Sequence, residues 1–504
     1  MSSTADTMPT EQISFSAWKT LLILSGINFL VLFVHTSLSP ALPMIAQEFA
    51  VSTSVSSWVM TAYMVSGAVM TIVIGRFSDL VGAKKMLMLL MICYTVGTIF
   101  AGFAHDISTL IGIRALQGVA IAVTPIGVKL VRDQFPKGKF SIGQSIILSM
   151  YSGGMAIGAV LGPIIAAGPG WQSVFYICAP IAVVLLFVSW KFIKVDEGKK
   201  IHEHDQLPSD MSDKASKKAR KKRIDIIGII TMAIAIISFL LAITFSGSIA
   251  TNLIAFVIPL VVGIISLILF IIVEKRTKSP LVNLKLMFHP VVLSGNVTML
   301  MFGVLQYIVI TGIPQLGAAA DPSGLGLEPE KIGFLQLHFG LAAMIFGPIF
   351  GLLAIRKGFN LKLMVPGMVI IAISFLLLLL FHATPRSVAG SLFLFGIAGA
   401  LLPITLTNTI ISFTPREYTG ISSAATNMMR IVGGAIGPVI TSVILASITV
   451  SITVDNAQKT YPSPVAFNIV FGMAVILAIA SVILSVRLKR LATKMVPLTA
   501  KDIV

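Results

Sequence analysis

Long apolar runs separated by short polar loops recur along the whole chain. A helix needs about 20 mostly apolar residues to cross the hydrocarbon core of a bilayer. Fourteen runs fit this length, at residues 20–42, 58–74, 86–104, 108–130, 141–167, 171–192, 226–247, 253–273, 291–313, 332–354, 363–381, 387–413, 420–449 and 467–486. The pattern predicts an all-α polytopic membrane protein with 14 transmembrane helices.

The positions of Lys and Arg support this count and predict the orientation. The chain has 37 Lys and Arg against 20 Asp and Glu, a net charge of +17. If successive runs alternate in direction, 32 of the basic residues fall on one side of the membrane and 3 on the other. Cytoplasmic loops carry an excess of Lys and Arg, so both termini are predicted to be cytoplasmic. A basic balance is also typical of nucleic-acid binding, but no RNA- or DNA-binding module accompanies these charges.

The composition indicates that lipid surrounds most of the chain. Hydrophobic residues make up 56% of the sequence and charged residues 11%, whereas soluble domains have roughly 25% charged residues. Cys93 and Cys178 lie inside apolar runs and are interpreted as small packing residues, without disulfide or metal-binding spacing. The polar residues 1–16 do not resemble a signal peptide, and the first apolar run is long enough to remain as a span.

Two patterns occur twice in the chain, eight spans apart. They are Gly75-x3-Asp79-x2-Gly82 with Gly351-x3-Ile355-x2-Gly358, and Gly118-x6-Pro125 with Gly396-x6-Pro403. Transporters are often built from repeated halves. The common offset predicts six helices, then two inserted helices, then six more.

The repeat and the loop charges together predict the domain organisation. The order is a cytoplasmic tail (1–19), an N-terminal six-helix bundle (20–193), a basic cytoplasmic linker (194–224), an inserted helix pair (225–274), a C-terminal six-helix bundle (275–487) and a cytoplasmic tail (488–504). The bases from Lys217 to Arg223 in the linker are expected to hold the orientation and to contact anionic lipid.

The loop after the second span carries the first recognisable motif. Its sequence Gly75-Arg-Phe-Ser-Asp79-Leu-Val-Gly82-Ala-Lys84-Lys85 resembles the signature of the major facilitator superfamily. Glycines let helix ends pack closely and turn tightly, and Asp79 is placed to pair with a neighbouring helix end. The resemblance implies a conformational latch formed by Gly75, Asp79, Gly82 and Lys84. For the two lysines, a charge that only sets topology is the simpler reading.

The fifth span carries Gly154, Gly158, Gly162 and Pro163. Their four-residue spacing puts the glycines on one helix face, where a partner helix can approach closely. The pattern resembles the antiporter motif of the superfamily, which is typical of exporters. Ala166 and Ala167 stand where the family often has two further glycines.

Two spans carry a buried arginine. Arg114-Ala-Leu-Gln117-Gly118 in the fourth span resembles a motif whose arginine is linked to proton coupling; an arginine that only bonds backbone carbonyls is the alternative. Asn427 and Arg430 belong to a thirteenth-span stretch that resembles the fourteen-span drug:proton antiporter branch of the superfamily. The resemblance extends from about Pro40 to Gly437 and implies a major-facilitator fold and alternating access.

The sequence departs from this branch at the first span. The branch usually has an aspartate nine residues before Pro43, and here Val34 occupies that position. No acid falls in the interior of any predicted span, although proton-driven antiport needs a protonatable group in the path. His35 and His338 lie in spans, and histidine can carry a proton near neutral pH. The hypothesis is that His35 replaces the missing aspartate; a hydrogen-bonded packing histidine is the alternative.

The function that follows is a secondary efflux carrier for amphipathic or drug-like molecules, with protons as a coupling partner. The missing acids leave a second reading open, a facilitator or exporter of an anionic metabolite that Arg114 and Arg430 would attract. A membrane enzyme would need a catalytic constellation, and a channel would need fewer spans and no latch loops. No nucleotide-binding loop, cofactor, metal site or catalytic residue is predicted. The expected setting is the cell membrane, as a multi-pass monomer in contact with lipids.

Overall fold

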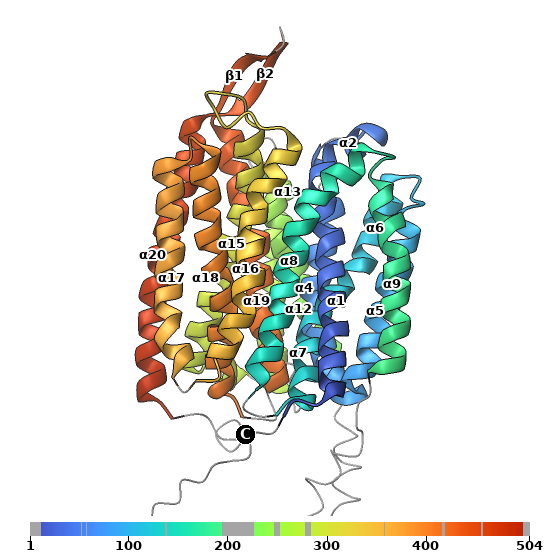
Figure 1. The fold of residues 1–504 in the computed structure, drawn as a ribbon, viewed down its shortest axis with the longest axis vertical. Helices are drawn as coiled ribbons and strands as arrows, with labels where there is room; N and C mark the ends of the chain where they lie inside the picture. The colour runs from blue at the N-terminus through green and yellow to red at the C-terminus, as the bar shows by residue number, and fades with distance from the viewer. Residues whose placement is uncertain are drawn as a thin grey trace, which may run out of the picture.

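The computed structural model describes residues 12–51, 53–56, 58–136, 139–193, 226–245, 252–277, 284–356, 358–415, 419–454 and 457–496. The predicted linker 194–224 and the ends of both predicted tails lie outside these residues. Long helices stand side by side and end at two opposite faces (Figure 1). Helix α1 begins and helix α20 ends at the same face, which is called the inner face below because the loop charges predict it to be cytoplasmic.

The helices fall into an N-terminal half, a C-terminal half and a pair between them. The N-terminal half contains α1 (Phe15–Ser37), η1 (Ser39–Ala41), α2 (Leu42–Glu48), α3 (Thr53–Ser56), α4 (Trp58–Val81), α5 (Ala83–Ala101), α6 (Ile107–Gly118), η2 (Val119–Ala122), α7 (Val123–Gln134), α8 (Phe140–Ala167) and α9 (Gln172–Phe192). The pair is α12 (Ile226–Phe245) and α13 (Leu253–Arg276). The C-terminal half contains α14 (Leu284–Met287), α15 (Pro290–Ala318), α16 (Pro329–Leu353), α17 (Phe359–Phe381), α18 (Pro385–Ser412), α19 (Thr419–Ser447) and α20 (Pro464–Lys494).

Thirteen helical stretches among the described residues are long and apolar enough to cross a membrane, with α6, η2 and α7 forming one of them. In α12 the apolar stretch covers Ile227–Phe239 and is shorter than a span. The all-helical prediction is therefore confirmed at the level of about thirteen candidate spans, and the count of fourteen stays a prediction.

Several helices begin where a side chain can cap their free N–H groups. The N-caps Ser14, Asp106, Thr384 and Ser463 each accept a hydrogen bond from the backbone N–H three residues later. At Asp106 the hydrogen bonds from Thr109 lower the pKa of the carboxyl group. Such caps satisfy donors that have no partner inside the helix, so they fix where these helices start.

Prolines explain two differences from the predicted spans. The first run, predicted to end at residue 42, ends as a helix at Ser37, and Pro40 and Pro43 begin the short elements η1 and α2. Proline fits the first turn of a helix but breaks its interior because it lacks an N–H. In the fourth span the chain tightens to a 3-10 turn at Val119–Ala122, just before Pro125.

A β-hairpin lies where the thirteenth predicted span ends. Strands β1 (Thr449–Val454) and β2 (Ala457–Pro462) pair antiparallel, with Thr449 opposite Pro462, and project beyond the helix ends at the outer face (Figure 1). The sequence prediction did not include this hairpin. Five of the six residues of β1 are β-branched, which is typical of a strand.

The two halves have separate hydrophobic cores. One cluster of buried residues runs from Ala17 to Ile193, with Ile431 added, and the other runs from Val291 to Ala492. The pair α12 and α13 meets α19 through a small cluster of Met232, Phe270 and Met428. The exposed side chains of α13 are largely apolar, as expected of a helix that faces lipid.

The halves use the same glycine contacts to pack their helices. A Cβ added to Gly154 or Gly158 of α8 would strike the carbonyl oxygen of Phe29 or Phe33 of α1. A Cβ added to Gly433 or Gly437 of α19 would strike the carbonyl oxygen of Leu300 or Val304 of α15. The helix pair α8–α1 thus corresponds to the pair α19–α15.

A second set of contacts extends this correspondence. An added Cβ on Gly118 of α6 would strike the Tyr63 carbonyl of α4, and one on Gly396 of α18 would strike the Phe339 carbonyl of α16. The repeat that two sequence patterns indicated is therefore present in the packing, and four helices of one half have a counterpart in the other half.

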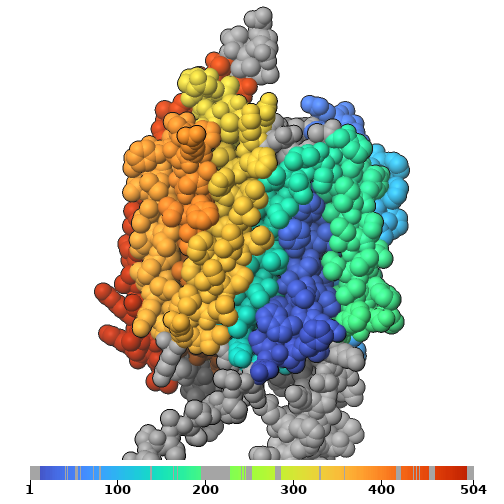
Figure 2. Space-filling view, viewed as in Figure 1, coloured from blue at the N-terminus to red at the C-terminus, as the bar shows by residue number. Residues whose placement is uncertain are grey.

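The two halves meet along two seams. In the first, Gly340, Gly347 and Gly351 of α16 pack on small residues of α8, respectively Ala156, Ser149 and Ser145. The surface view shows α8 in teal lying against α16 in yellow (Figure 2). In the second seam α4 contacts α19, where a Cβ added to Gly75 would lie 3.1 Å from the Cβ of Ala424.

Candidate functional site

Arg114 is fully buried inside the N-terminal half. Its Nη1 donates to Oε1 of Gln117 at 2.8 Å, and its Nε donates to the Val59 carbonyl at 3.2 Å. Its guanidinium carbon lies 4.3 Å from the centre of the Tyr63 ring. A charge at this depth is costly unless protein groups solvate it, and here backbone, amide and aromatic groups do so.

His35 completes this cluster from α1. Its Nδ1 lies 3.2 Å from Nη2 of Arg114, and its ring stacks on Tyr63 with ring centres 4.5 Å apart. Arginine has only donors, so Nδ1 accepts this hydrogen bond. His35 therefore carries its single proton on Nε2 and is neutral in this conformation.

Further hydrogen bonds tie the cluster to three neighbouring helices. Gln117 donates from Nε2 to Oγ1 of Thr98 on α5 at 3.0 Å. Tyr63 and Tyr94 donate to the carbonyls of Val31 and Leu30 in α1, each at 3.1 Å. The polar network formed by His35, Tyr63, Tyr94, Thr98, Arg114 and Gln117 thus joins α1, α4, α5 and α6, and is called the N-half network below.

Arg430 lies between the two halves, whereas Arg114 lies inside one of them. It belongs to α19 and is 4% exposed. Nη2 donates to Oδ1 of Asn427 at 2.9 Å, and Nη1 donates to Oε1 of Gln306 at 3.4 Å. Its guanidinium carbon lies 4.5 Å from the centre of the Tyr151 ring, on α8 of the other half. Among the described residues no acidic side chain pairs with Arg430.

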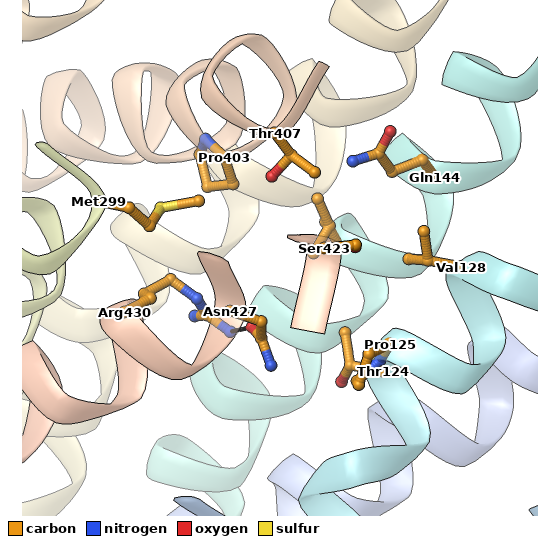
Figure 3. A pocket seen from close by; sticks show the side chains of 11 residues that line it. Thr124, Pro125, Val128, Gln144, Met299, Pro403, Thr407, Ser423, Asn427 and Arg430 are labelled. Carbon is orange, nitrogen blue, oxygen red and sulfur yellow. Dashed lines mark hydrogen bonds between the residues drawn. The ribbon is translucent and has the colours of Figure 1, made fainter. Parts of the chain in front are cut away.

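A pocket opens beside Arg430 and is lined by both halves. Together with the open solvent at its mouth, it contains about 340 Å³ of space not filled by atoms. In Figure 3 Arg430 and Asn427 lie on one side of this space and Gln144 on another, with Ser423 between them. The described residues of the lining are Thr124, Pro125, Val128, Gln144, Leu148, Met299, Pro403, Thr407, Ser423, Asn427 and Arg430.

Two further pockets follow this one along α8. Arg430 also lines the second pocket, together with Tyr151 and Gln306. The third pocket is lined by Thr36, Ala156 and Gln336, among others. From Gln144 in the first pocket to Ala156 in the third, α8 rises by about 18 Å. The three pockets therefore lie in a row between the halves, from near the inner face past Arg430 and outward, and this row is called the path below.

The remaining predicted residues lie at several places. His338 is exposed on α16, where its Nδ1 lies 2.9 Å from the Phe334 carbonyl, and it joins neither cluster. Gly162 faces the backbone of Ser37 in α1. Gly82 adopts φ 103° at the start of α5, a conformation that favours glycine. Lys84 is half-buried.

Two of the predicted motif positions are only partly described. Asp79 lies in the last turn of α4 and Pro163 lies within α8, but their side chains fall outside the described part of the chain. The partner of Asp79 in the predicted latch therefore stays a prediction.

Sequence reasoning missed the aromatic partners of both arginines. Tyr63 lies under Arg114 and His35, and Tyr151 lies under Arg430. A signal for Tyr151 was present, because it precedes Gly154 by three residues and Arg430 precedes Gly433 by three. The two positions correspond in the repeat, and the structure brings them face to face.

Acids are absent from the interior of the described spanning helices. Each acid in these helices lies in a first or last turn, namely Asp79, Asp133, Glu274 and Glu330. Within the same part of the chain, no three His, Cys, Asp or Glu side chains come together as metal ligands would. The buried charges near the path are therefore the two arginines.

Known proteins resemble the chain in sequence and in fold. It is 26% identical over 430 residues to the methyl viologen resistance protein SmvA of Salmonella typhimurium, covering 84% of this chain and 82% of SmvA. It is 24% identical to the multidrug resistance protein Stp of Mycobacterium tuberculosis, covering 88% and 79%. It is also 24% identical to the multidrug efflux pump LfrA of Mycolicibacterium smegmatis, covering 84% and 79%.

The fold and the family profile agree with these relatives. The crystal structure of the human organic anion transporter MFSD10 superposes with a TM-score of 0.60 at 12% identity, covering 93% of this chain and 99% of that one. This likeness concerns the fold alone. The profile of the Major Facilitator Superfamily matches residues 24–211, 211–438 and 296–499. The chain therefore belongs to the Major Facilitator Superfamily and is a multi-pass membrane transporter.

Proposed function

We propose that this transporter exports amphipathic small molecules by alternating access and that proton binding at His35 drives the cycle. The observation that carries the proposal is the hydrogen bond between Nδ1 of His35 and Nη2 of Arg114. We further propose fourteen spans with both termini in the cytoplasm, and a monomer at the cell membrane. The efflux and resistance names of three relatives at 24–26% identity support the export direction.

The packing of the halves supports alternating access. Each half has its own hydrophobic core, and the halves meet along two seams rather than through a shared core. Bodies of this kind can rotate against each other without unpacking. The path along α8 lies between them, so a rotation opens one end of the path as it closes the other.

The geometry around His35 links its proton to this motion. A proton on Nδ1 would set a second cation 3.2 Å from Arg114, so protonation separates the two side chains. His35 lies two residues beyond Phe33, whose carbonyl packs on Gly158 of α8. Its neighbour Thr36 lines the third pocket. Displacement of His35 therefore shifts α1 where α1 contacts the path.

The test uses proteoliposomes with an imposed pH gradient and fluorescent amphipathic probes of each charge. His35→Gln keeps an acceptor for Arg114 but cannot carry a proton. We expect it to lose gradient-driven accumulation by at least about tenfold while it keeps saturable exchange across equal pH. His338→Ala is the matched control, because His338 is exposed and outside the network, and it should accumulate probe like the unaltered protein.

Two outcomes decide against parts of the proposal. Accumulation by His35→Gln at the unaltered rate would remove His35 from the coupling role. Saturable downhill flux in the unaltered protein that no pH gradient drives would make the protein a facilitator instead.

A further inference from the structure

We infer that the pocket beside Arg430 binds amphipathic organic anions, with the acidic group of the substrate placed against the Arg430 guanidinium. The inference rests on the proposed export function and adds the substrate class. It comes from four features of the pocket: its charge, its unpaired polar atoms, its apolar wall and its position on the path.

The charge of the pocket is positive and uncompensated. Arg430 is the one charged residue among the described residues of the lining, which otherwise consist of hydroxyl, amide and apolar side chains. Its described partners are two amide oxygens and the face of Tyr151. Amide oxygens solvate a guanidinium but do not neutralise it. An organic anion can supply the missing charge through a bidentate contact with the guanidinium, whereas a cation would be repelled.

Two residues of the pocket lining each carry a buried polar atom that has no hydrogen-bond partner in the described structure. The atoms are Oε1 of Gln144, a residue 1% exposed, and Nδ2 of Asn427. Buried polar atoms are nearly always hydrogen-bonded, so unpaired polar atoms on residues that line a pocket point to a bound group. Asn427 is the stronger indication, because its Oδ1 already accepts from Arg430 and its Nδ2 is a second donor close to the guanidinium.

The remaining wall is apolar and comes from both halves. Pro125, Val128 and Leu148 belong to the N-terminal half, and Met299 and Pro403 to the C-terminal half. Such a wall suits an aromatic ring or an alkyl chain, because ligand sites combine a hydrophobic surface with a few placed polar groups. A small inorganic anion would leave this wall empty, so the substrate is amphipathic.

The position of Arg430 makes this charge contact part of the transport cycle. Arg430 lines both the first and the second pocket and stacks on Tyr151 across the boundary between the halves. An anion that binds the guanidinium from the inner side therefore contacts the group that bridges the two halves. Substrate binding can in this way alter the contact between α19 and α8.

Binding is tested with three probes that share one ring. They are 1-naphthoate, the uncharged 1-naphthamide and 1-naphthylmethylammonium, each titrated against the full-length protein in detergent. We expect saturable binding of naphthoate at least about tenfold tighter than that of the other two probes. Arg430→Gln should weaken naphthoate binding by at least about tenfold and remove the preference. Arg386→Gln, at an exposed arginine in the first turn of α18, should bind naphthoate like the unaltered protein.

A second variant keeps the test decisive if Arg430→Gln does not fold. Gln144→Glu is close to isosteric and places a carboxylate in the same pocket. We expect it to bind naphthoate more weakly and naphthylmethylammonium more tightly. Equal binding of the three probes by the unaltered protein, a preference for the ammonium, or no saturable naphthoate binding would each overturn the assignment.

Membrane potential separates this inference from the proposed coupling. Exit of an anion and entry of a proton both carry positive charge inward, so an inside-negative potential should accelerate naphthoate export. Exchange of a monovalent cation for one proton is electroneutral and would not respond. Naphthoate binding and counterflow without any response to a pH gradient would leave the substrate class intact and remove only the proton coupling.

Discussion

Gly118 in the N-terminal half and Gly396 in the C-terminal half occupy corresponding places, and the residues around them differ in kind. Four residues before Gly118 stands Arg114, and four before Gly396 stands Leu392. The residue just before the glycine is Gln117 in one half and Phe395 in the other. The helix that faces the glycine presents Tyr63 in one half and Phe339 in the other.

The C-terminal half fills this space with phenylalanines. Phe395 is fully buried, and its ring centre lies 6.5, 5.6 and 5.7 Å from those of Phe302, Phe339 and Phe375. Aromatic pairs at such distances add to the stability that burial alone gives. None of these side chains can change charge, so this part of the C-terminal half has the same packing at any pH.

The two halves therefore share the same helix packing, but their polar and charged side chains stand at different places. A buried polar network is costly unless every member is satisfied, and the phenylalanine cluster demonstrates that the fold can fill the same space without one. The N-half network is therefore a candidate for a functional rather than a packing role. In the C-terminal half the charge instead stands at Arg430, on the boundary that faces the path.

Replacement of Arg114 should give the largest effect on transport. Arg114→Leu introduces the residue found at the corresponding position, Leu392. It leaves Oε1 of Gln117 without its hydrogen-bond donor, at a cost of about 1–3 kcal/mol. It also removes the hydrogen bond that Nδ1 of His35 accepts. We expect gradient-driven accumulation to fall by more than about tenfold in proteoliposomes that contain equal amounts of folded protein. Leu392→Met changes the counterpart at nearly constant volume and should cost less than about 1.5 kcal/mol. If Arg114→Leu transports normally, the network serves packing alone.

Truncation of Phe395 should lower stability rather than coupling. Phe395→Ala opens a cavity in the cluster and should cost about 3–5 kcal/mol, measured as a lower thermal unfolding temperature in detergent. Phe393→Ala is the control, because Phe393 lies on the same helix and is 37% exposed, so its loss should matter much less. Transport per folded molecule should stay unchanged in both variants. A selective loss of proton-driven transport in Phe395→Ala would contradict this difference between the two halves.

The smallest effects should come from glycines that stand in open space. Gly112 and Gly390 each lie six residues before the corresponding glycines Gly118 and Gly396, and an added Cβ would meet nothing within 4 Å at either position. Alanine is favoured over glycine in a helix by about 0.8–1.0 kcal/mol, so Gly112→Ala and Gly390→Ala should leave unfolding temperatures equal or slightly raised. Gly118→Ala and Gly396→Ala should lower them, because the added Cβ meets backbone. A different ranking in the two halves would show that the scaffolds are not equivalent.

Much of the fold was predictable because lipid imposes a simple rule on the sequence. A spanning helix must be apolar over its length, so hydropathy alone located the spans that the structure describes. The ends of the helices were harder to predict, since they depend on local features such as Pro40 after α1 and the hairpin after α19. For α12 the rule predicts a span at 226–247, whereas the apolar stretch of the described helix covers Ile227–Phe239, so the count of fourteen stays a prediction.

The site was predictable in its residues but not in its contacts. Arg114, Arg430 and His35 stood out because polar groups at span depth are expensive. The stacking of Tyr63 under Arg114 and His35 depends on how α1, α4 and α6 are oriented, which no pattern in a single helix records. His338 met the same sequence criterion as His35, yet the rotation of α16 leaves it exposed.

The stacking of Arg430 on Tyr151 is also a contact that two identical halves could not make. Positions that correspond in a two-fold repeat and face each other would bear identical residues in a homodimer of half-length chains. Two arginines at that point would repel, whereas two tyrosines can stack. An arginine fits this place only where the facing position carries a different residue, so the contact depends on one chain whose two halves differ in sequence.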